Sequence, residues 1–264
     1  MSKGTWAGLV IGLVLLTIGA AYLWYAPPRE SAERAAEVLP TPEVAAAPVE
    51  TPLPEPSAMP AEPVAELPML EESDPTVRDA LVDAFGAPPV EAYLLPDRIV
   101  RRFVATVDSL DTDPVRAKSR PLAPVEGRLL VEKVGDTILL SPRNAERYEA
   151  YISALQAADT AKIASVYLRY YPLFQRAYEE LGYPKRSFND RFIAIIDHLL
   201  EAPTPPEPVE LVRPKVVYQF DDAQLESLSW GQKTLVRIGT ANAATVKSKL
   251  RELRAAIVGQ PAAR

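Results

Sequence analysis

The chain has 264 residues, 27 prolines, no cysteine and a formal net charge of −6. Without cysteine sulfur it forms neither a disulfide framework nor a thiolate metal site. The charge is unevenly spread, because residues 26–73 carry two arginines against ten glutamates, whereas residues 74–264 carry 26 basic against 25 acidic residues. Nucleic-acid-binding domains usually have a strongly basic face, so the balanced C-terminal part predicts no nucleic-acid partner.

The first 25 residues are predicted to be an N-terminal transmembrane anchor. From Trp6 to Tyr25 no side chain is charged, and about 20 apolar residues in a helix cross roughly 30 Å of hydrocarbon. We therefore expect residues 6–25 to lie in the lipid bilayer. The run is longer than the apolar region of a signal peptide, which favours retention over the alternative of cleavage near Ala21.

Two further properties of this segment bear on assembly and orientation. Gly4, Gly8 and Gly12 are four residues apart, a spacing of small residues that lets two membrane helices approach closely and is compatible with a homodimer. The alternative is that glycine is simply common in membrane helices. Basic residues are nearly balanced on the two sides of the apolar run, so the positive-inside rule leaves its orientation open.

Residues 26–66 are predicted to be a disordered Pro/Ala/Glu-rich linker. Eleven prolines occur between Ala26 and Ser73, with no glycine and no aromatic residue. Proline removes backbone donors and fixes φ, so such a segment favours an extended spacer over a packed core. The excess of glutamates extends it further through charge repulsion.

Residues 67–258 are predicted to form a single, mainly α domain with one small β-hairpin, followed by a disordered tail at residues 259–264. Apolar residues recur there at three- and four-residue steps, as in amphipathic helices. Capping residues or prolines mark the helix starts, and glycines mark several ends. The predicted starts lie at Asp74, after Pro96, at Ser141, at Asp159, near Asn189 and at Thr240, and the predicted ends include Gly86, Gly182 and Gly239.

The strand signals are fewer. Residues 129–134 and 137–140 flank the turn pair Gly135 and Asp136 and predict the hairpin. A Pro-rich connector is expected at residues 203–214, followed by an edge strand at residues 216–220. Pro172 is expected to kink the helix that it interrupts near Tyr171.

Four long strings resemble one uncharacterised proteobacterial family, the domain of unknown function 3014. The resemblance extends from Leu67 to Ile257 and implies a bacterial source, an N-terminal membrane span and a Pro-rich spacer before the shared part. It implies no activity, cofactor or catalytic residue. The strings are LPMLEESDPTVRDAL, RRFVATVDSL, RYYPLFQRAYEELGYPKRSFNDRFIAIIDHLL and GQKTLVRIGTANAATVKSKLRELRAAI.

No residue pattern indicates catalysis, a metal site or a cofactor. The single histidine, His198, follows Asp197 on a predicted helix, and a metal site usually needs three or four convergent ligands. Ser187 and Asp190 have the spacing of a capping box, which predicts helix initiation. Glu179 is expected to be solvated beside Glu180 at a helix end. We therefore predict no catalytic residue, no metal ligand and no cofactor.

The densest aromatic cluster, between residues 167 and 192, supplies a candidate binding surface. Helical spacing predicts that most of its rings are core. A 100° step per residue sends Tyr171 and Gln175 to a neighbouring face, where exposed rings beside amides and arginines would suit a sugar or a peptide. The candidate residues are Tyr171, Gln175, Tyr178, Asn189, Asp190 and Arg191.

Three functional hypotheses follow. The first is a membrane-tethered helical interaction or scaffold domain of the bacterial cell envelope, located at the inner membrane with its main domain in the periplasm, whose partner is an envelope protein or cell-wall polymer. The second is an enzyme acting on an envelope polymer through Asp190, Asp197 or Glu179. The third is an adaptor that faces the cytoplasm at the inner membrane.

Overall fold

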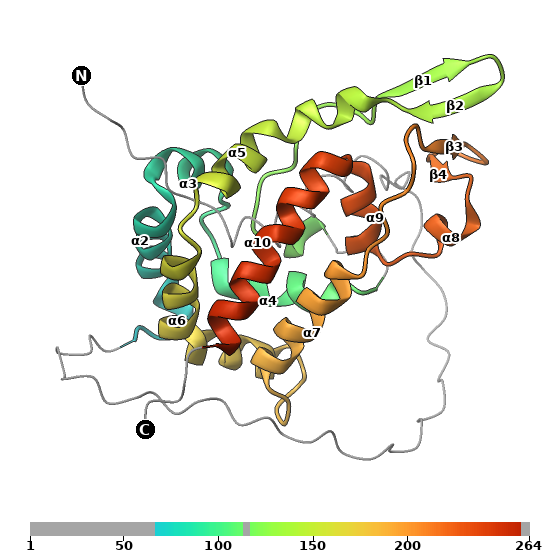
Figure 1. Ribbon diagram of the computed structural model, residues 1–264. Helices are drawn as coiled ribbons and strands as arrows, with labels where there is room; N and C mark the ends of the chain where they lie inside the picture. The colour runs from blue at the N-terminus through green and yellow to red at the C-terminus, as the bar shows by residue number, and fades with distance from the viewer. Residues whose placement is uncertain (1–66, 113–116, 260–264) are drawn as a thin grey trace, which may run out of the picture.

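The computed structural model describes residues 67–112 and 117–259 (Figure 1). The predicted anchor at residues 1–25, the predicted linker at residues 26–66 and residues 260–264 of the predicted tail lie outside these ranges. Among the helices of these two ranges, none combines the length and the hydropathy that a membrane span requires.

The described part is mainly helical, as the periodicity predicts. Short 3-10 turns at Leu70–Glu72, Ala117–Ser119, Pro142–Asn144 and Glu146–Tyr148 accompany the longer elements. The α-helices are α2 (Ser73–Phe85), α3 (Ala87–Tyr93), α4 (Ile99–Ser109), α5 (Glu149–Ala157), α6 (Thr160–Glu180), α7 (Phe188–Leu200), α8 (Ala223–Glu226), α9 (Trp230–Arg237) and α10 (Thr240–Val258). The strands are β1 (Val131–Val134), β2 (Thr137–Leu140), β3 (Glu210–Val212) and β4 (Gln219–Phe220).

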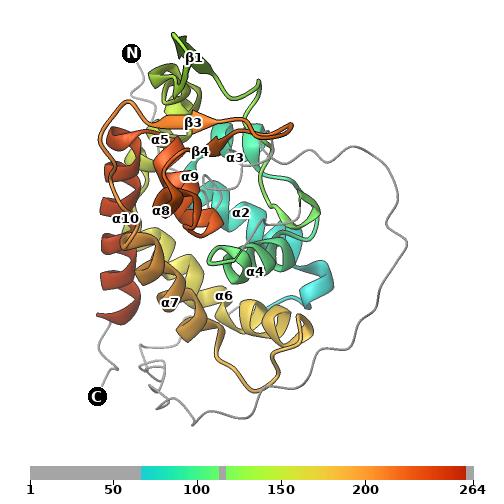
Figure 2. The same cartoon turned by 90° about the vertical axis from the view of Figure 1, so that its right-hand side faces the viewer.

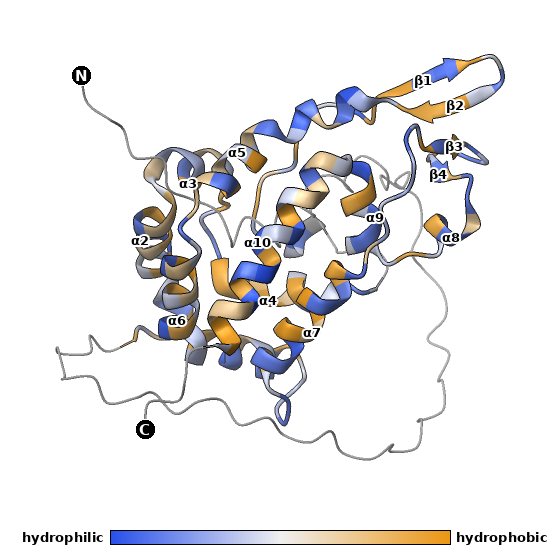
Figure 3. Ribbon diagram, in the orientation of Figure 1, coloured by the Kyte–Doolittle hydropathy of each residue, from blue (hydrophilic) through white to orange (hydrophobic). Residues whose placement is uncertain are grey.

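The helices pack around one large apolar core. The long helix α6 packs against α2, α4, α7 and α10, and α10 also packs against α5 and α9. Apolar residues occur on α4, α7 and α10 (Figure 3), and the buried ones belong to this core. The predicted stripe of α10 is confirmed, because all four of its members are at most 4% exposed: Val246, Leu250, Leu253 and Ile257.

The sheet extends the predicted hairpin to four strands. All neighbours are antiparallel in the order β1-β2-β3-β4, with Glu132 opposite Leu139 and Ile138 opposite Leu211. The prediction of a single hairpin is therefore corrected, since β3 lies inside the Pro-rich connector and β4 covers only the end of the predicted edge strand. In both views the β1–β2 hairpin lies at the top of the molecule, away from α6 and α7 (Figures 1 and 2).

The sheet has a small core of its own. It consists of Leu140, Val209, Leu211, Phe220, Leu225 and Val236. Val236 comes from α9, whereas Leu235 and Ile238 beside it belong to the large core of the helical body. The helix α9 therefore joins the two cores.

Several predicted helix caps are present in the structure, and two are not. Asp159 and Ser187 accept hydrogen bonds from the first backbone N–H groups of α6 and α7, as predicted. Asp74 does not cap its own helix, because its carboxylate accepts from the N–H groups of Arg98 (2.6 Å) and Ile99 (2.7 Å) at the start of α4. Long-range packing thus replaces a predicted local cap.

The second exception is the start of α10. Gly239, and not Thr240, is the N-cap residue. The Glu207 carboxylate accepts from the backbone N–H of Thr240 (3.1 Å) and from its hydroxyl (2.7 Å). Pro172 lies inside α6, which continues through it to Glu180, and the kink near Tyr171 stays a prediction.

Candidate functional site

The predicted surface residues gather where the end of α6 meets the start of α7. Gln175 on α6 ties these two helices together, because its Oε1 accepts from the Phe188 N–H (2.8 Å) and from the Tyr171 hydroxyl (3.1 Å). Its Nε2 donates to the Arg186 carbonyl (2.9 Å). The side chain therefore holds the first turn of α7 on α6.

Two of the six candidates are buried. Tyr178 is 1% exposed and stacks on Tyr183 with 4.7 Å between ring centroids. Asn189 is 9% exposed and accepts from the hydroxyl of Tyr167 at 3.1 Å. Burial also raises the pKa of Tyr167 well above its usual range, so this hydroxyl keeps its proton. Tyr178 and Asn189 thus belong to the interior, in line with the helical spacing that predicts core rings.

Arg191 joins α7 to the end of α4. Its Nε donates to Asp108 Oδ1 (2.9 Å), and its Nη1 and Nη2 donate to the two carboxylate oxygens of Asp111 (2.7 and 2.8 Å). Burial alone would lower the pKa of Arg191, but the hydrogen bonds and charges of both aspartates outweigh it and raise that pKa. Asp190 beside it is exposed. The arrangement holds α4 and α7 together.

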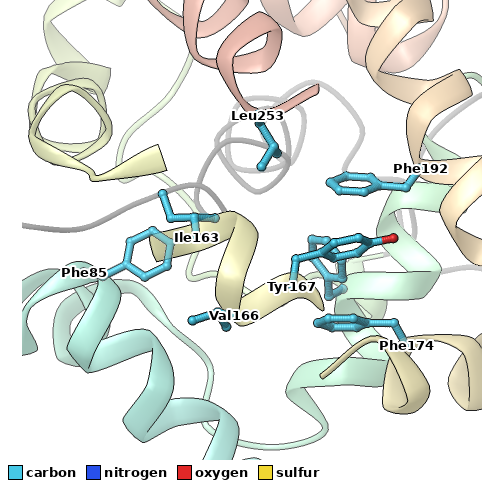
Figure 4. A pocket seen from close by; sticks show the side chains of 8 residues that line it. Phe85, Ile163, Val166, Tyr167, Phe174, Phe192 and Leu253 are labelled. Carbon is cyan, nitrogen blue, oxygen red and sulfur yellow. The ribbon is translucent and has the colours of Figure 1, made fainter. Parts of the chain in front are cut away.

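A small cavity lies deeper, between α2, α4, α6, α7 and α10 (Figure 4). Its volume is about 20 Å³, which is room for about one water molecule, whereas small-molecule sites have several hundred Å³. The Tyr167 hydroxyl points away from it (Figure 4). This space is a packing gap in the core. Its walls are Phe85, Phe103, Ile163, Val166, Tyr167, Phe174, Phe192 and Leu253.

The histidine has a partner that sequence spacing did not indicate. His198 Nε2 lies 2.8 Å from the hydroxyl of Ser229, which accepts from the Gln232 N–H at 3.3 Å and caps α9. Its neighbour Asp197 turns elsewhere and accepts from Arg254 at 2.6 and 2.9 Å. The contact between His198 and Ser229 joins α7 to α9. Because Asp197 is paired with Arg254, it does not complete a Ser–His–Asp triad with these two residues.

The three carboxylates of the enzyme hypothesis have different surroundings. Glu179 accepts from Gln175, Asp190 lies in the first turn of α7, and Asp197 is paired with Arg254 of α10. Within residues 67–112 and 117–259, no group of three or more His, Asp or Glu side chains is placed to hold a metal ion.

The sheet has two edges that differ, and sequence reasoning did not distinguish them. At the β4 edge, the Phe220 N–H donates to the Glu226 carboxylate of α8 at 2.9 Å. At the β1 edge, Val134 is 63% exposed and Leu130, just before the strand, is 37% exposed. A strand edge of this kind can pair with another chain. The sequence signal is the apolar, charged, apolar alternation of Leu130, Glu132 and Val134.

These features define a mainly helical domain with an appended four-stranded antiparallel sheet. The polar side chains described above chiefly hold the helices of this domain together. The model of one family, described as "Protein of unknown function (DUF3014)", matches residues 99–254. This match covers more than half of the chain, so the chain belongs to that family, as the four sequence strings predict. No curated protein and no solved structure matches the chain.

Proposed function

We propose that the protein is a membrane-tethered helical interaction or scaffold domain of the bacterial cell envelope. In this proposal residues 6–25 anchor it in the inner membrane, residues 26–66 form the spacer, and the helical domain meets a partner protein or cell-wall polymer in the periplasm. The apolar run from Trp6 to Tyr25 and the Pro-rich composition after it support the tether.

One observation carries the interaction role. The charged and amide side chains that were candidates for chemistry are used to fix helices to one another, as Arg191 does with Asp108 and Asp111 and as Asp197 does with Arg254. Groups held in this way rigidify a body and its surface. The structure therefore favours a rigid platform that presents an edge, and supports it better than a cleft in which carboxylates converge.

The enzyme hypothesis is weaker for the same reason. A carboxylate pair acting on a glycosidic bond needs two acidic groups that flank the substrate, whereas Asp197 is paired with the guanidinium of Arg254 through two hydrogen bonds. The adaptor hypothesis shares the interaction role and differs only in the side of the membrane.

Two experiments test the proposal. Alkaline phosphatase fused to the C-terminus folds to an active form only after export, so activity is expected and its absence would favour the adaptor. Full-length protein crosslinked in cells and purified in detergent is expected to retain one specific envelope protein or cell-wall fragment. Recovery of no specific component under several crosslinking conditions would contradict the interaction role.

A further inference from the structure

We infer that the β1 edge binds an extended peptide segment of another protein as a fifth, antiparallel strand, with a basic residue opposite Glu132. This inference rests on the proposed interaction role and names the surface and the chemistry of the partner. Strand addition of this kind combines main-chain hydrogen bonds with side-chain selection at alternate positions.

The backbone geometry identifies the groups that are available. The Ser141 N–H donates to the Leu130 carbonyl, and the Leu140 N–H donates to Val209 next to β3. Because N–H and C=O groups alternate in direction along a strand, residues 130, 132 and 134 face β2. Val131 and Lys133 therefore direct their N–H and C=O groups away from β2, and no other described strand pairs with β1.

The opposite edge shows that this opening is particular to β1. There the Phe220 N–H is already bound by Glu226, and Lys233 of α9 holds that carboxylate at 3.0 Å. Proteins commonly close sheet edges by such devices, because a free edge invites pairing. In the part of the chain that the structure describes, one edge is closed by its own chain and the other offers four backbone groups.

The side chains at the open edge set the chemistry of the ligand. Leu130, Glu132 and Val134 share the outer face, and in a new antiparallel pair they would occupy the non-hydrogen-bonded positions, where opposite side chains are closest. In the bound peptide, apolar residues suit the positions opposite Leu130 and Val134, and a basic residue suits the position opposite Glu132. On the inner face, Lys133 calls for an acidic neighbour.

A second copy of the chain fits this edge poorly. The two-fold pairing that sets Leu130 opposite Val134 also sets Glu132 opposite Glu132, and like charges directly opposite are destabilising. If the second strand is shifted by two residues in one direction, Lys133 lies opposite Lys133, again a pair of like charges. If it is shifted by two residues in the other direction, the apolar Leu130 lies opposite the charged Glu132. Residues 26–73 fit no better, because eleven prolines lack donors and ten glutamates repel Glu132.

A peptide pair tests the inference on full-length protein in detergent. The first labelled peptide has the core Ile-Glu-Arg-Val-Ile, in which arginine faces Glu132 and glutamate faces Lys133. The control peptide has the core Ile-Arg-Glu-Val-Ile, which has the same composition with both charges exchanged. Fluorescence anisotropy is expected to show about tenfold tighter binding of the first, since two cross-strand charge pairs change from opposite to like. Equal affinities would overturn the inference.

Variants of the edge supply the matched controls. Val131→Pro removes an outward N–H that β2 does not use, whereas Val131→Ala truncates the side chain and keeps that N–H. Binding is expected to be lost in Val131→Pro and kept in Val131→Ala. The exchange Glu132→Lys with Lys133→Glu is expected to reverse the peptide preference, which loss of folding cannot do. Equal binding by both Val131 variants would contradict the inference.

The same variants separate the two proposals. A crosslinked envelope partner that stays bound to Val131→Pro would overturn strand addition and leave the interaction role intact. If the peptides bind saturably and with the expected charge preference, but no specific partner is recovered from cells, strand addition at the β1 edge would be supported and the proposed function contradicted.

Discussion

The helical body and the sheet bury their apolar side chains in different ways. The body interlocks large rings, for instance Phe192, which lies 5.8 Å from Phe103 and 5.1 Å from Tyr167 between ring centroids. The small core at the sheet has six apolar side chains, to which the strands contribute Leu140, Leu211 and Phe220, while Leu225 comes from α8 and Val236 from α9. A small sheet needs a hydrophobic face packed on something else for stability. The body is therefore expected to be the stable unit and the sheet the part that opens first.

Arg237 lies at the junction of the two regions. It is 3% exposed, its guanidinium carbon lies 5.2 Å from the centre of the Phe220 ring, and burial lowers its pKa to about 10. Helix α9 thus carries an apolar residue for each core and a buried cation between them. The sheet depends on the body through this helix, whereas the packing of α6 with α4 and α10 does not involve the sheet.

The largest effect is expected from Phe192→Ala in the body. Truncating a buried ring removes its packing and enlarges a core that already contains a small cavity, so we expect a loss of about 4 kcal/mol in the free energy of unfolding. Urea denaturation followed by circular dichroism measures it, with the exposed Leu181→Ala as a control expected within about 0.5 kcal/mol. A loss below about 1 kcal/mol would contradict the view that the interlocked rings make the helical body the more stable region.

Leu211→Ala tests the sheet. Leu211 is 3% exposed and faces both Ile138 and Phe220, so we expect a local loss of about 2 to 3 kcal/mol. Hydrogen exchange is expected to accelerate for amides of β2, β3 and β4 while those of α6 and α10 stay protected. Equal acceleration in both regions would show that sheet and body unfold as one unit.

A smaller effect is expected from Arg191→Ala, which leaves Asp108 and Asp111 without their shared cation. Charge-assisted hydrogen bonds at a partly buried site make a loss of about 2 kcal/mol reasonable. Arg176→Ala is the control, because Arg176 is 66% exposed and lies 3.7 Å from Glu180, an arrangement expected to contribute less than about 0.5 kcal/mol. Similar losses for both variants in urea denaturation would refute the structural role of Arg191.

Glu207→Ala is expected to have the smallest effect, about 0.5 to 1 kcal/mol, because it removes the cap of α10. Hydrogen bonds from the Thr240 hydroxyl and N–H lower the pKa of Glu207. A carboxyl with a lowered pKa stabilises the fold above its unfolded pKa, and this stabilisation is lost as pH falls through the folded pKa. The difference between wild type and variant should therefore shrink on acidification. A difference that does not change between neutral and acidic pH would contradict this role, and Glu207→Gln tests the charge separately.

The helices and their local caps were predictable, whereas the partners across the fold were not. Asp159 and Ser187 cap helices that begin at the next residue, so the signal is contained in a few neighbouring letters. Asp74 instead caps a helix that begins 25 residues later. Arg191 binds Asp108 and Asp111, which lie 83 and 80 residues earlier in the chain. Such contacts depend on how helices pack, which periodicity alone does not specify.

The candidate surface shows the same division. Tyr171, Gln175, Asn189 and Asp190 lie where α6 and α7 meet, because they flank one turn, and their role as a binding surface stays a prediction. The sequence did not reveal that Gln175 is used to fix α7, or that Ser229 would meet His198. The alternation of Leu130, Glu132 and Val134 indicates a strand but does not indicate an open edge, since a strand becomes an edge only when the order of the sheet is known.

By itself the sequence determined the uneven charge, the mainly helical character, the β1–β2 hairpin and the family, because each is written in composition, period or neighbouring residues. Only the tertiary structure decided that β3 forms within a Pro-rich connector. Its three residues gain their conformation from pairing with β2 and β4, and pairing of distant strands leaves little trace in a short stretch of chain. The same reason explains why one sheet edge is closed and the other is open.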